Sequence, residues 1–533
     1  MSSIACRCRH PIFSGSGLGD IRLYKSSPRL QYGANIRLVE GRNLGGAFTR
    51  FFRYIAPIVQ KALPFIKSGA KAAGKEVLQG GLEILENIND KPLKDLMKEQ
   101  TKKRVQNLSE KAAQTLKKNL SEELMIFEKK PNQVAIDSSE FVKVSSVNSI
   151  ENSNIVEFRD LGSARAFKAL SQTLLVADIQ VIKSDGKLYT SEDSKQPTLA
   201  NNILASLIKS ISLSLNNVNV VTISETYAQR EYIEDVLNYN EETVKNKLWM
   251  QGLYPIETAA EKIKESTKNS KIIQLITTLN LCTTSKLLIP NVDIYIKLEL
   301  ANAAFPIIED DTSTSKIVIK NIYLMMKYVY CKTGYNMFVE RELSDKTKAV
   351  YDFKSSLILN YTLPNNTTEF SIPSIYTGAK PSFVLIAFVK TSSFLGDNKE
   401  DPHKYQIFDM NKFNFILNGQ LHPKTPFVFK NDETEQKIAK LYMNLQHSIG
   451  MDCNNESNLV TQKNFTTNNF FISLDLSSFN FALSDINEAT ENVNLGFSVV
   501  FSKPTPHPIT ALLYILRPRC FEISPARVVD VIY

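Results

Sequence analysis

Cysteine is scarce in this chain, which excludes a fold built on disulfides. The six cysteines among 533 residues are Cys6, Cys8, Cys282, Cys331, Cys453 and Cys520. Disulfide-built domains are short and dense in cysteine, so thiols scattered over this length indicate a reducing compartment. Cys6 and Cys8 stand near His10, but this spacing gives zinc only three donors in a poor geometry. We therefore expect unpaired thiols and no metal.

Long apolar runs are absent as well. No stretch reaches the roughly 18 apolar residues that a membrane-spanning helix needs. Residues 1–10 also lack the apolar core of a secretory leader. We therefore expect a protein that is not secreted.

Residue types that carry out catalysis are few. The five histidines show no metal spacing, and no Ser/His/Asp or Cys/His set has a supporting context. Gly15–Gly19 (GSGLG) has the glycines of a nucleotide loop, but no predicted strand precedes it, so a flexible arm is the better interpretation. We expect His403 and His422 to be solvated loop residues and Trp249 to anchor a core. The sequence thus predicts no enzyme and no cofactor.

Positive charge is concentrated at the N-terminus. Residues 1–75 hold 13 Lys/Arg against two acids, a local charge of +11, while the whole chain is only +8. The other residues therefore sum to −3. Such a basic segment can neutralise a polyanion or an anionic surface. The side chains that we expect to contact nucleic acid or membrane are Arg22, Lys25, Arg29, Arg37, Arg42, Arg50, Arg53, Lys61, Lys67, Lys71 and Lys75.

The same region divides into coil and helix by its pattern. Residues 14–46 repeat glycine among Arg and Lys, and cannot bury enough apolar surface to offset their ordering entropy. A helical apolar stripe runs from Phe48 to Ile66, interrupted by Pro57 and Pro64. A second helical stretch covers about 92–127. We predict a basic arm with an amphipathic helix over 1–81 and a helical linker over 82–131.

From about Val134 the pattern changes to strands. Apolar and alternating runs bounded by turn residues occur at 174–183, 211–215, 294–300, 317–330, 356–363, 383–390, 413–417, 471–476, 495–501 and 511–516. Asn216-Asn217 and Asn418-Gly419 each separate two such runs, as tight hairpins require. A helix is predicted at Tyr227–Leu248, with Ser224 as its N-cap.

Four of these runs recur in chain order. LLVADIQVIK at 174 is repeated in type by FVLIAFVK at 383, and runs at 211, 294 and 317 are repeated at 413, 495 and 509. The offsets are 209, 202, 201 and 192 residues, which indicates a duplicated β domain. Units of this size fit the eight-stranded jelly roll. We predict a mainly β fold of two tandem jelly-roll sandwiches, at 132–335 and 345–533, the first with a helical insertion near 224–271.

Particular segments resemble a known family. Segment 206–249 resembles the strand, hairpin and Tyr-rich helix of the major capsid proteins of adintoviruses and the related Polinton (Maverick) elements. Gln229–Glu234 and Leu237–Tyr239 match that family's aromatic-Arg-x-Tyr-[IL]-Glu-x-x-Leu-Asn-Tyr pattern, except that Gln229 replaces the aromatic residue. Residues 381–388 and 408–419 are similar to its second-half strand pair. The resemblance covers about 134–533.

The resemblance implies a structural protein of a virion, assembled in the nucleus or cytoplasm of a host cell. The implied partners are two further copies in a pseudo-hexameric homotrimer, neighbouring capsomers, a penton-like minor capsid protein and a double-stranded DNA genome bound without sequence preference. Elaborations of this fold clamp neighbours, so we expect the insertion Ser224–Leu248 to form a contact surface outside the first sandwich. The alternatives are a penton-like vertex protein with one sandwich, and a domesticated nucleic-acid or membrane-binding protein that no longer assembles.

The N-terminal segment carries a resemblance of its own. Residues 15–33, 51–57 and 69–81 resemble a small basic virion protein of the same elements, which is compared with adenovirus core and minor proteins. Its basic side chains could bind DNA by counterion release, bind a membrane through the apolar stripe, or pack on the inner face of the body. Leu78–Leu82 (LQGGL) resembles the signal cut by adenovirus-type maturation proteases, here between Gly81 and Leu82. Gly80 and Gly81 could instead end a helix.

Overall fold

The computed structural model describes residues 134–149, 153–193, 196–281, 284–309, 315–345, 347–429, 434–451, 457–477 and 491–532. These residues form the body of the chain. The predicted arm and helical linker lie outside them.

The first half of the body is a sandwich of two four-stranded antiparallel sheets. One sheet has the order β1 (Ile136–Ser145), β10 (Ser315–Cys331), β3 (Ala166–Lys183) and β7 (Ile272–Thr278). The other has the order β2 (Ile155–Asp160), β8 (Ile294–Leu300), β5 (Ile208–Leu215) and β6 (Val218–Ile223). This interleaving of early and late strands in both sheets is the jelly-roll topology.

The second half repeats that topology strand for strand. One sheet has the order β11 (Ala349–Leu363), β18 (Ile509–Ile523), β13 (Phe383–Lys390) and β16 (Phe471–Asp475), with β19 (Val529–Ile532) also paired to β18. The other has the order β12 (Glu369–Ala379), β17 (Asn492–Phe501), β14 (Met410–Leu417) and β15 (Gln420–Val428). The predicted fold of two tandem jelly rolls is therefore confirmed.

The four recurring sequence runs occupy equivalent strands of the two sandwiches. They fall on β3 and β13, β5 and β14, β8 and β17, and β10 and β18. Both predicted hairpins are also present, at the same place in each sandwich. Asn216 and Asn217 have φ of 46° and 66°, and Asn418 and Gly419 have φ of 51° and 78°. These left-handed turns match the twist of the strands that they join.

Helices lie mainly in matching connections of the two sandwiches. Between β6 and β7 lie α5 (Tyr227–Asn238), α6 (Glu241–Asn246), η3 (Leu248–Gln251), α7 (Ile256–Thr267) and η4 (Lys268–Ser270). Between β15 and β16 lie α10 (Thr434–Ser448) and α11 (Gln462–Phe465). The connection from β3 to β5 holds β4 (Thr198–Leu199) and α4 (Ile203–Ser206), and that from β13 to β14 holds α9 (Thr391–Leu395). β9 (Ile307–Ile308) pairs with β4.

The helix predicted over 227–248 is shorter than expected. It ends at Asn238, because Tyr239 is extended and Asn240 begins α6 by accepting a hydrogen bond from the Thr243 amide at 2.8 Å. The N-cap is Thr226 rather than Ser224.

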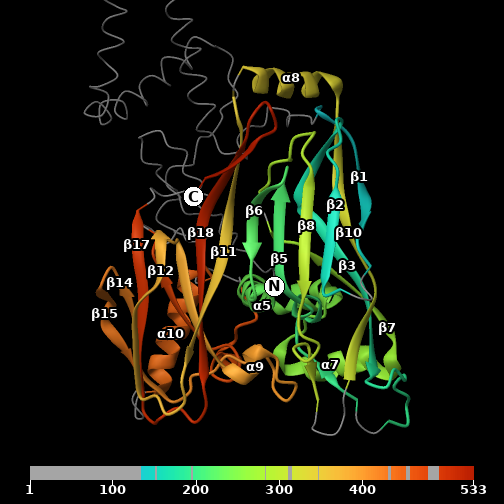
Figure 1. Cartoon of the computed structure of the whole chain (residues 1–533). Helices are drawn as coiled ribbons and strands as arrows, with labels where there is room; N and C mark the ends of the chain where they lie inside the picture. Colours follow the sequence, from blue (N-terminus) through green and yellow to red (C-terminus); the bar gives the residue numbers. More distant parts are fainter. Residues whose placement is uncertain are drawn as a thin grey trace, which may run out of the picture. The chain divides into compact units, whose positions relative to one another are not determined.

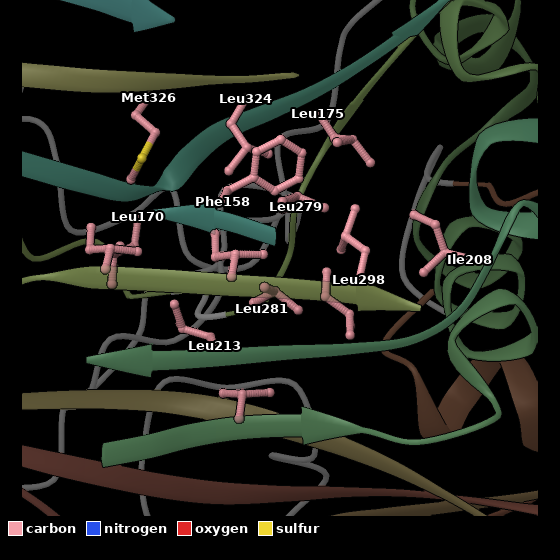
Figure 2. Packing of buried hydrophobic residues seen from close by; sticks show 14 of the residues in the cluster. Phe158, Leu170, Leu175, Ile208, Leu213, Leu279, Leu281, Leu298, Leu324 and Met326 are labelled. Carbon is pink, nitrogen blue, oxygen red and sulfur yellow. The ribbon is translucent and has the colours of Figure 1, made fainter. Parts of the chain in front are cut away.

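The core of the first sandwich lies between its two sheets. Along β8 alternate residues, Ile294, Ile296 and Leu298, are buried, as expected of a strand with one face inward. Figure 2 shows how apolar side chains from β2, β3, β5, β8 and β10 meet between the sheets, with Phe158 of β2 near Leu324 of β10. This packing fixes the sandwich on which the connecting helices are placed.

The helix α8 (Thr333–Ser344) joins the two sandwiches. It follows β10 and lies across the end of the first sandwich, on the side opposite to α7 (Figure 1). Among the described residues, no helix has the length and apolarity that a membrane crossing requires.

Candidate functional site: the junction between the sandwiches

The described residues contain none of the nucleic-acid, membrane or cleavage-site residues predicted from the sequence. All eleven basic residues from Arg22 to Lys75, and Gly80, Gly81 and Leu82, lie outside them. Cys6, Cys8 and His10 lie outside them too. Within the described part of the chain, no group of three or more His, Cys, Asp or Glu residues could hold a metal ion. The site that the structure does build is the junction between the two sandwiches.

The helix α5 belongs by sequence to the first sandwich but packs into the core of the second. Tyr232, Ile233, Val236 and Leu237 are all buried there, in one apolar cluster with strands β13 and β18. The expectation that this insertion forms a contact surface toward neighbouring subunits is therefore wrong for α5. Its aromatic and apolar face is used within the chain.

A buried arginine links α5 to both halves of the chain. The Arg230 guanidinium lies 2.5 Å from Glu231 Oε1 and 2.9 Å from Glu234 Oε2. It donates to Ser356 Oγ on β11 at 2.5 Å and to the Asn280 carbonyl at 3.0 Å. Four acceptors with fixed positions around a planar donor set hold the helix in one orientation.

The carboxylates around Arg230 connect the network to neighbouring strands and turns. Glu234 accepts a hydrogen bond from the Tyr514 hydroxyl of β18 at 3.0 Å. Asp235 accepts from Asn202 at 2.8 Å and from Gln251 at 2.6 Å. Burial raises the pKa of Glu231 to about 7, although Arg230 opposes that rise. Burial also raises the pKa of Asp235 well above its usual range, with Glu231 adding to the effect.

A histidine completes this end of the junction. The ring of His403, from the β13–β14 connection, stacks on Tyr232 with centroids 4.4 Å apart and planes 7° apart. His403 Nε2 is hydrogen-bonded to Ser206 Oγ of α4 at 3.1 Å. Only 1% of His403 is exposed, and burial lowers its pKa to about 3. The prediction that His403 is a solvated loop residue is wrong, whereas His422 is exposed, on β15.

A second set of contacts joins the sandwiches near α8. Arg527, in the β18–β19 turn, donates to the Pro290 carbonyl at 3.0 Å and to Glu340 of α8 at 2.5 Å. Its own carbonyl accepts from Asn216 in the β5–β6 hairpin at 2.7 Å. The Tyr351 hydroxyl of β11 donates to the Leu287 carbonyl and accepts from the Ile289 amide, each at 3.1 Å. The halves are thus fixed at two separate places.

Two other features of the described surface have little part in this junction. Trp249 was expected to anchor a core, but it is 50% exposed at the end of α6, in η3. A pocket of about 320 Å³ near α9 is lined by charged and polar residues, among which Lys390 and Glu400 form an ion pair. Its charges are therefore partly neutralised within the chain.

The junction makes the two sandwiches one unit. Helix α5 supplies apolar surface to the second core, and its charged residues find partners on β11 and β18. A buried charge is costly when unpaired, so this network favours one relative orientation over others. We therefore expect the two sandwiches to move as one rigid body.

Comparisons with known proteins agree with this architecture. No protein-family model matches the chain. An uncharacterised protein of Caenorhabditis elegans is 20% identical over 396 residues, which cover 70% of this chain and 92% of that protein. Among solved structures, the PBCV-1 virus capsid has a TM-score of 0.50 at 10% identity, covering 76% of this chain and 99% of that one. At this identity the likeness concerns the fold.

Two further solved structures have lower scores. The structure of the Sputnik virophage has a TM-score of 0.49 at 11% identity, covering 78% of this chain and 92% of that one. The mavirus major capsid protein has a TM-score of 0.45 at 10% identity, covering 78% and 93%.

Proposed function

We propose that the chain is a capsid subunit of a virus or virus-like element, which assembles as a pseudo-hexameric homotrimer that tiles a shell. The observation that carries this proposal is the pair of jelly rolls with one strand order, joined by side-chain hydrogen bonds at two places. Three such chains around a threefold axis present six similar wedges, a plate of near-hexagonal outline. Rigid coupling of the wedges is what such a plate requires.

The kinship with adintovirus and Polinton (Maverick) capsid proteins is part of the proposal. The motif that resembles this family, Gln229–Glu234, lies on α5 and supplies the charged and aromatic residues of the junction. Residues that set the angle between two sandwiches would be retained together in a capsid family. This role gives the sequence pattern a physical reason.

The proposed partners follow from the assembly and from the arm. Neighbouring capsomers and a penton-like vertex protein would contact the body. The basic residues Arg22 to Lys75 would bind double-stranded DNA without sequence preference or, through the apolar stripe, a membrane. A maturation protease would cut between Gly81 and Leu82. The protein would act in the virion, after assembly in a host cell.

The test of assembly uses the full chain at rising concentration. Light scattering behind size exclusion should give three times the 60.1 kDa chain mass, about 180 kDa, and electron microscopy should show plates of hexagonal outline. A monomer at all concentrations, without plates or shells, would sink the proposal.

The same measurement decides between the alternatives. Two sandwiches in the body argue against a vertex protein with one jelly roll. The relative in an animal, Caenorhabditis elegans, favours the domesticated protein as the second candidate. That candidate predicts a stable monomer that still binds DNA or vesicles.

The arm is tested by the salt dependence of DNA binding. Changing Arg22, Arg29 and Arg37 to Gln in the full chain should make the slope of log affinity against log salt concentration less negative by about 3. Each phosphate contact contributes about 0.9 to that slope. The matched control changes three exposed body lysines, Lys187, Lys245 and Lys262. Equal slopes for both variants would show that these three arginines do not contact DNA. Vesicle leakage without DNA binding would favour the membrane role.

A further inference from the structure

A lysine and an aspartate form a buried pair between the two sheets of the first sandwich. Asp160 ends β2, whereas Lys168 lies near the start of β3 in the other sheet. Their side chains are 7% and 2% exposed, and Lys168 Nζ lies 2.8 Å from Asp160 Oδ2. The strands around this pair carry apolar core residues close by in sequence, namely Phe158, Leu170 and Met326 (Figure 2). Water therefore has little access to the pair.

The charges of this pair are poorly compensated. Lys168 Nζ donates to the carbonyls of Leu161 and Val292, each at 3.4 Å, which is long for a hydrogen bond. Asp160 Oδ2 accepts no hydrogen bond from the described residues, since the 2.8 Å contact with Nζ lacks the required direction. A buried ion pair offsets its lost hydration when its geometry is good and its remaining donors and acceptors are satisfied. Neither condition holds here, so a reaction that removes both charges is favoured.

A tyrosine hydroxyl lies against the other carboxylate oxygen. The Tyr328 hydroxyl of β10 donates to Asp160 Oδ1 at 2.5 Å. Tyr328 is the register partner of Lys168 in the β10–β3 pairing. The Lys168 amide and carbonyl are themselves bonded to Leu288, at 3.1 and 2.8 Å. Three strands thus fix an amine, a carboxyl carbon and a donor that would stabilise negative charge on Oδ1.

We propose that Lys168 and Asp160 condense to an amide, an isopeptide bond between the two sheets. The ammonium first gives one proton to the carboxylate, which leaves two uncharged groups in the buried site. Nζ then adds to Cγ, the C–N bond forms and the C–Oδ2 bond breaks. Oδ2 leaves as water with two of the three ammonium protons, so the reaction needs no oxidant, reductant or co-reactant. Fixed contact is equivalent to roughly 10⁵–10⁸ M of one reactant, which replaces activation of the acid.

Other ion pairs of the body lack this combination. Lys183 Nζ lies 2.7 Å from Asp193 Oδ1, but the two side chains are 33% and 24% exposed, so water hydrates both charges. Arg230 is as deeply buried as Lys168, but a guanidinium stays protonated and is no nucleophile. The inference concerns the single chain and does not rest on the proposed function.

The mass of the full-length chain under denaturing conditions tests the bond. The natural chain should lack the mass of one water, and so should the matched control Lys183→Arg. Lys168→Arg should have the full mass of its own sequence. Full mass in the natural chain, or a missing water that persists in Lys168→Arg, would overturn the proposal.

Tryptic digestion locates the bond. Trypsin cuts after Arg159 and Arg165 but not after an acylated Lys168. Peptides 160–165 and 166–183 should therefore be recovered as one branched species with two amino termini, Asp160 and Ala166. Fragmentation that instead places the missing water at another residue would refute the assignment.

The rate of bond formation tests the part played by Tyr328. In freshly synthesised full-length chain, Tyr328→Phe should form the bond about 100-fold more slowly, because the donor to Oδ1 is lost. Tyr330→Phe is the matched control on the same strand, since its hydroxyl donates to the exposed Glu140. It should react at the natural rate. Equal rates in the two variants would contradict the proposed geometry.

Discussion

Replacing Arg230 by methionine tests the junction at its centre. Methionine keeps much of the volume but removes every donor to Glu231, Glu234, Ser356 and the Asn280 carbonyl. Two carboxylates then remain in the interior without a cation. Breaking a buried ion pair in this way costs about 3–5 kcal/mol, a large part of the about 5–15 kcal/mol that stabilises a folded domain.

The single tryptophan is a convenient probe for this experiment. Trp249 lies in η3, whose residue Gln251 donates to Asp235 of the junction. In urea at pH 7, fluorescence of Trp249 and far-UV circular dichroism should give one common transition for the natural chain. In Arg230→Met the fluorescence transition should come first, because the two sandwiches are no longer coupled.

Two further variants serve as a rescue and as a control for Arg230→Met. Adding Glu231→Gln and Glu234→Gln to Arg230→Met removes the uncompensated charges and should restore most of the lost stability. Lys245→Met breaks an exposed ion pair with Glu241 on α6 and should cost no more than about 0.5 kcal/mol. The reasoning is refuted if Arg230→Met unfolds like the natural chain, or if the triple variant is no more stable than the single one.

Other predictions concern pH, packing and processing. Because burial lowers the pKa of His403 to about 3 from 6.5, its stabilising contribution is complete above pH 6.5 and is lost as pH falls. Relative to His403→Gln, the natural chain should lose roughly 1 kcal/mol of stability per pH unit from 6.5 to 4.5. Burial raises the pKa of Glu231 to about 7 from 4.5, so the stability that its protonated form contributes is lost as pH rises from 4.5 through 7. Parallel curves of unfolding free energy against pH for the natural chain and Glu231→Gln would contradict this. A Cβ on Gly496 would lie 2.1 Å from a carbonyl oxygen of β12, so Gly496→Ala should lower the urea midpoint, whereas Gly334→Ala, with open space around it, should not. Mass spectrometry of mature particles should find a chain that begins at Leu82; a full-length chain beside cleaved precursors would exclude processing there.

The sequence predicts the central strands of all four sheets but misses most of the edges. Strands β3, β5, β8 and β10, and their equivalents β13, β14, β17 and β18, all carry a predicted run. Central strands pack on both neighbours and bury apolar residues, which gives a clear pattern. Edge strands such as β1, exposed over most of its length, and β15, which contains Pro423, lack that pattern.

The junction was only partly visible in the sequence. The continuous apolar runs 383–389 and 511–516 are the signal for strands buried on both faces, and they could have predicted that helices cover this sheet. The charges of α5 gave no such signal, because Arg230 and Glu234 at a helical spacing of four are equally typical of a solvated face. The burial of His403 depends on Tyr232, 171 positions earlier, and no local pattern contains that contact.

The packing of α5 also has a consequence for synthesis of the protein. Glu234 and Tyr514 are 280 residues apart, so at about 5–20 residues per second the ribosome needs roughly 14–56 s to supply the partner strand. During that time the side of α5 that packs on the second sandwich, including Ile233 and Val236, lacks the contacts with strand β18. We therefore expect the nascent chain to expose part of this apolar face until the second sandwich is complete. For the same reason, neither sandwich can be expected to remain soluble when it is expressed without the other.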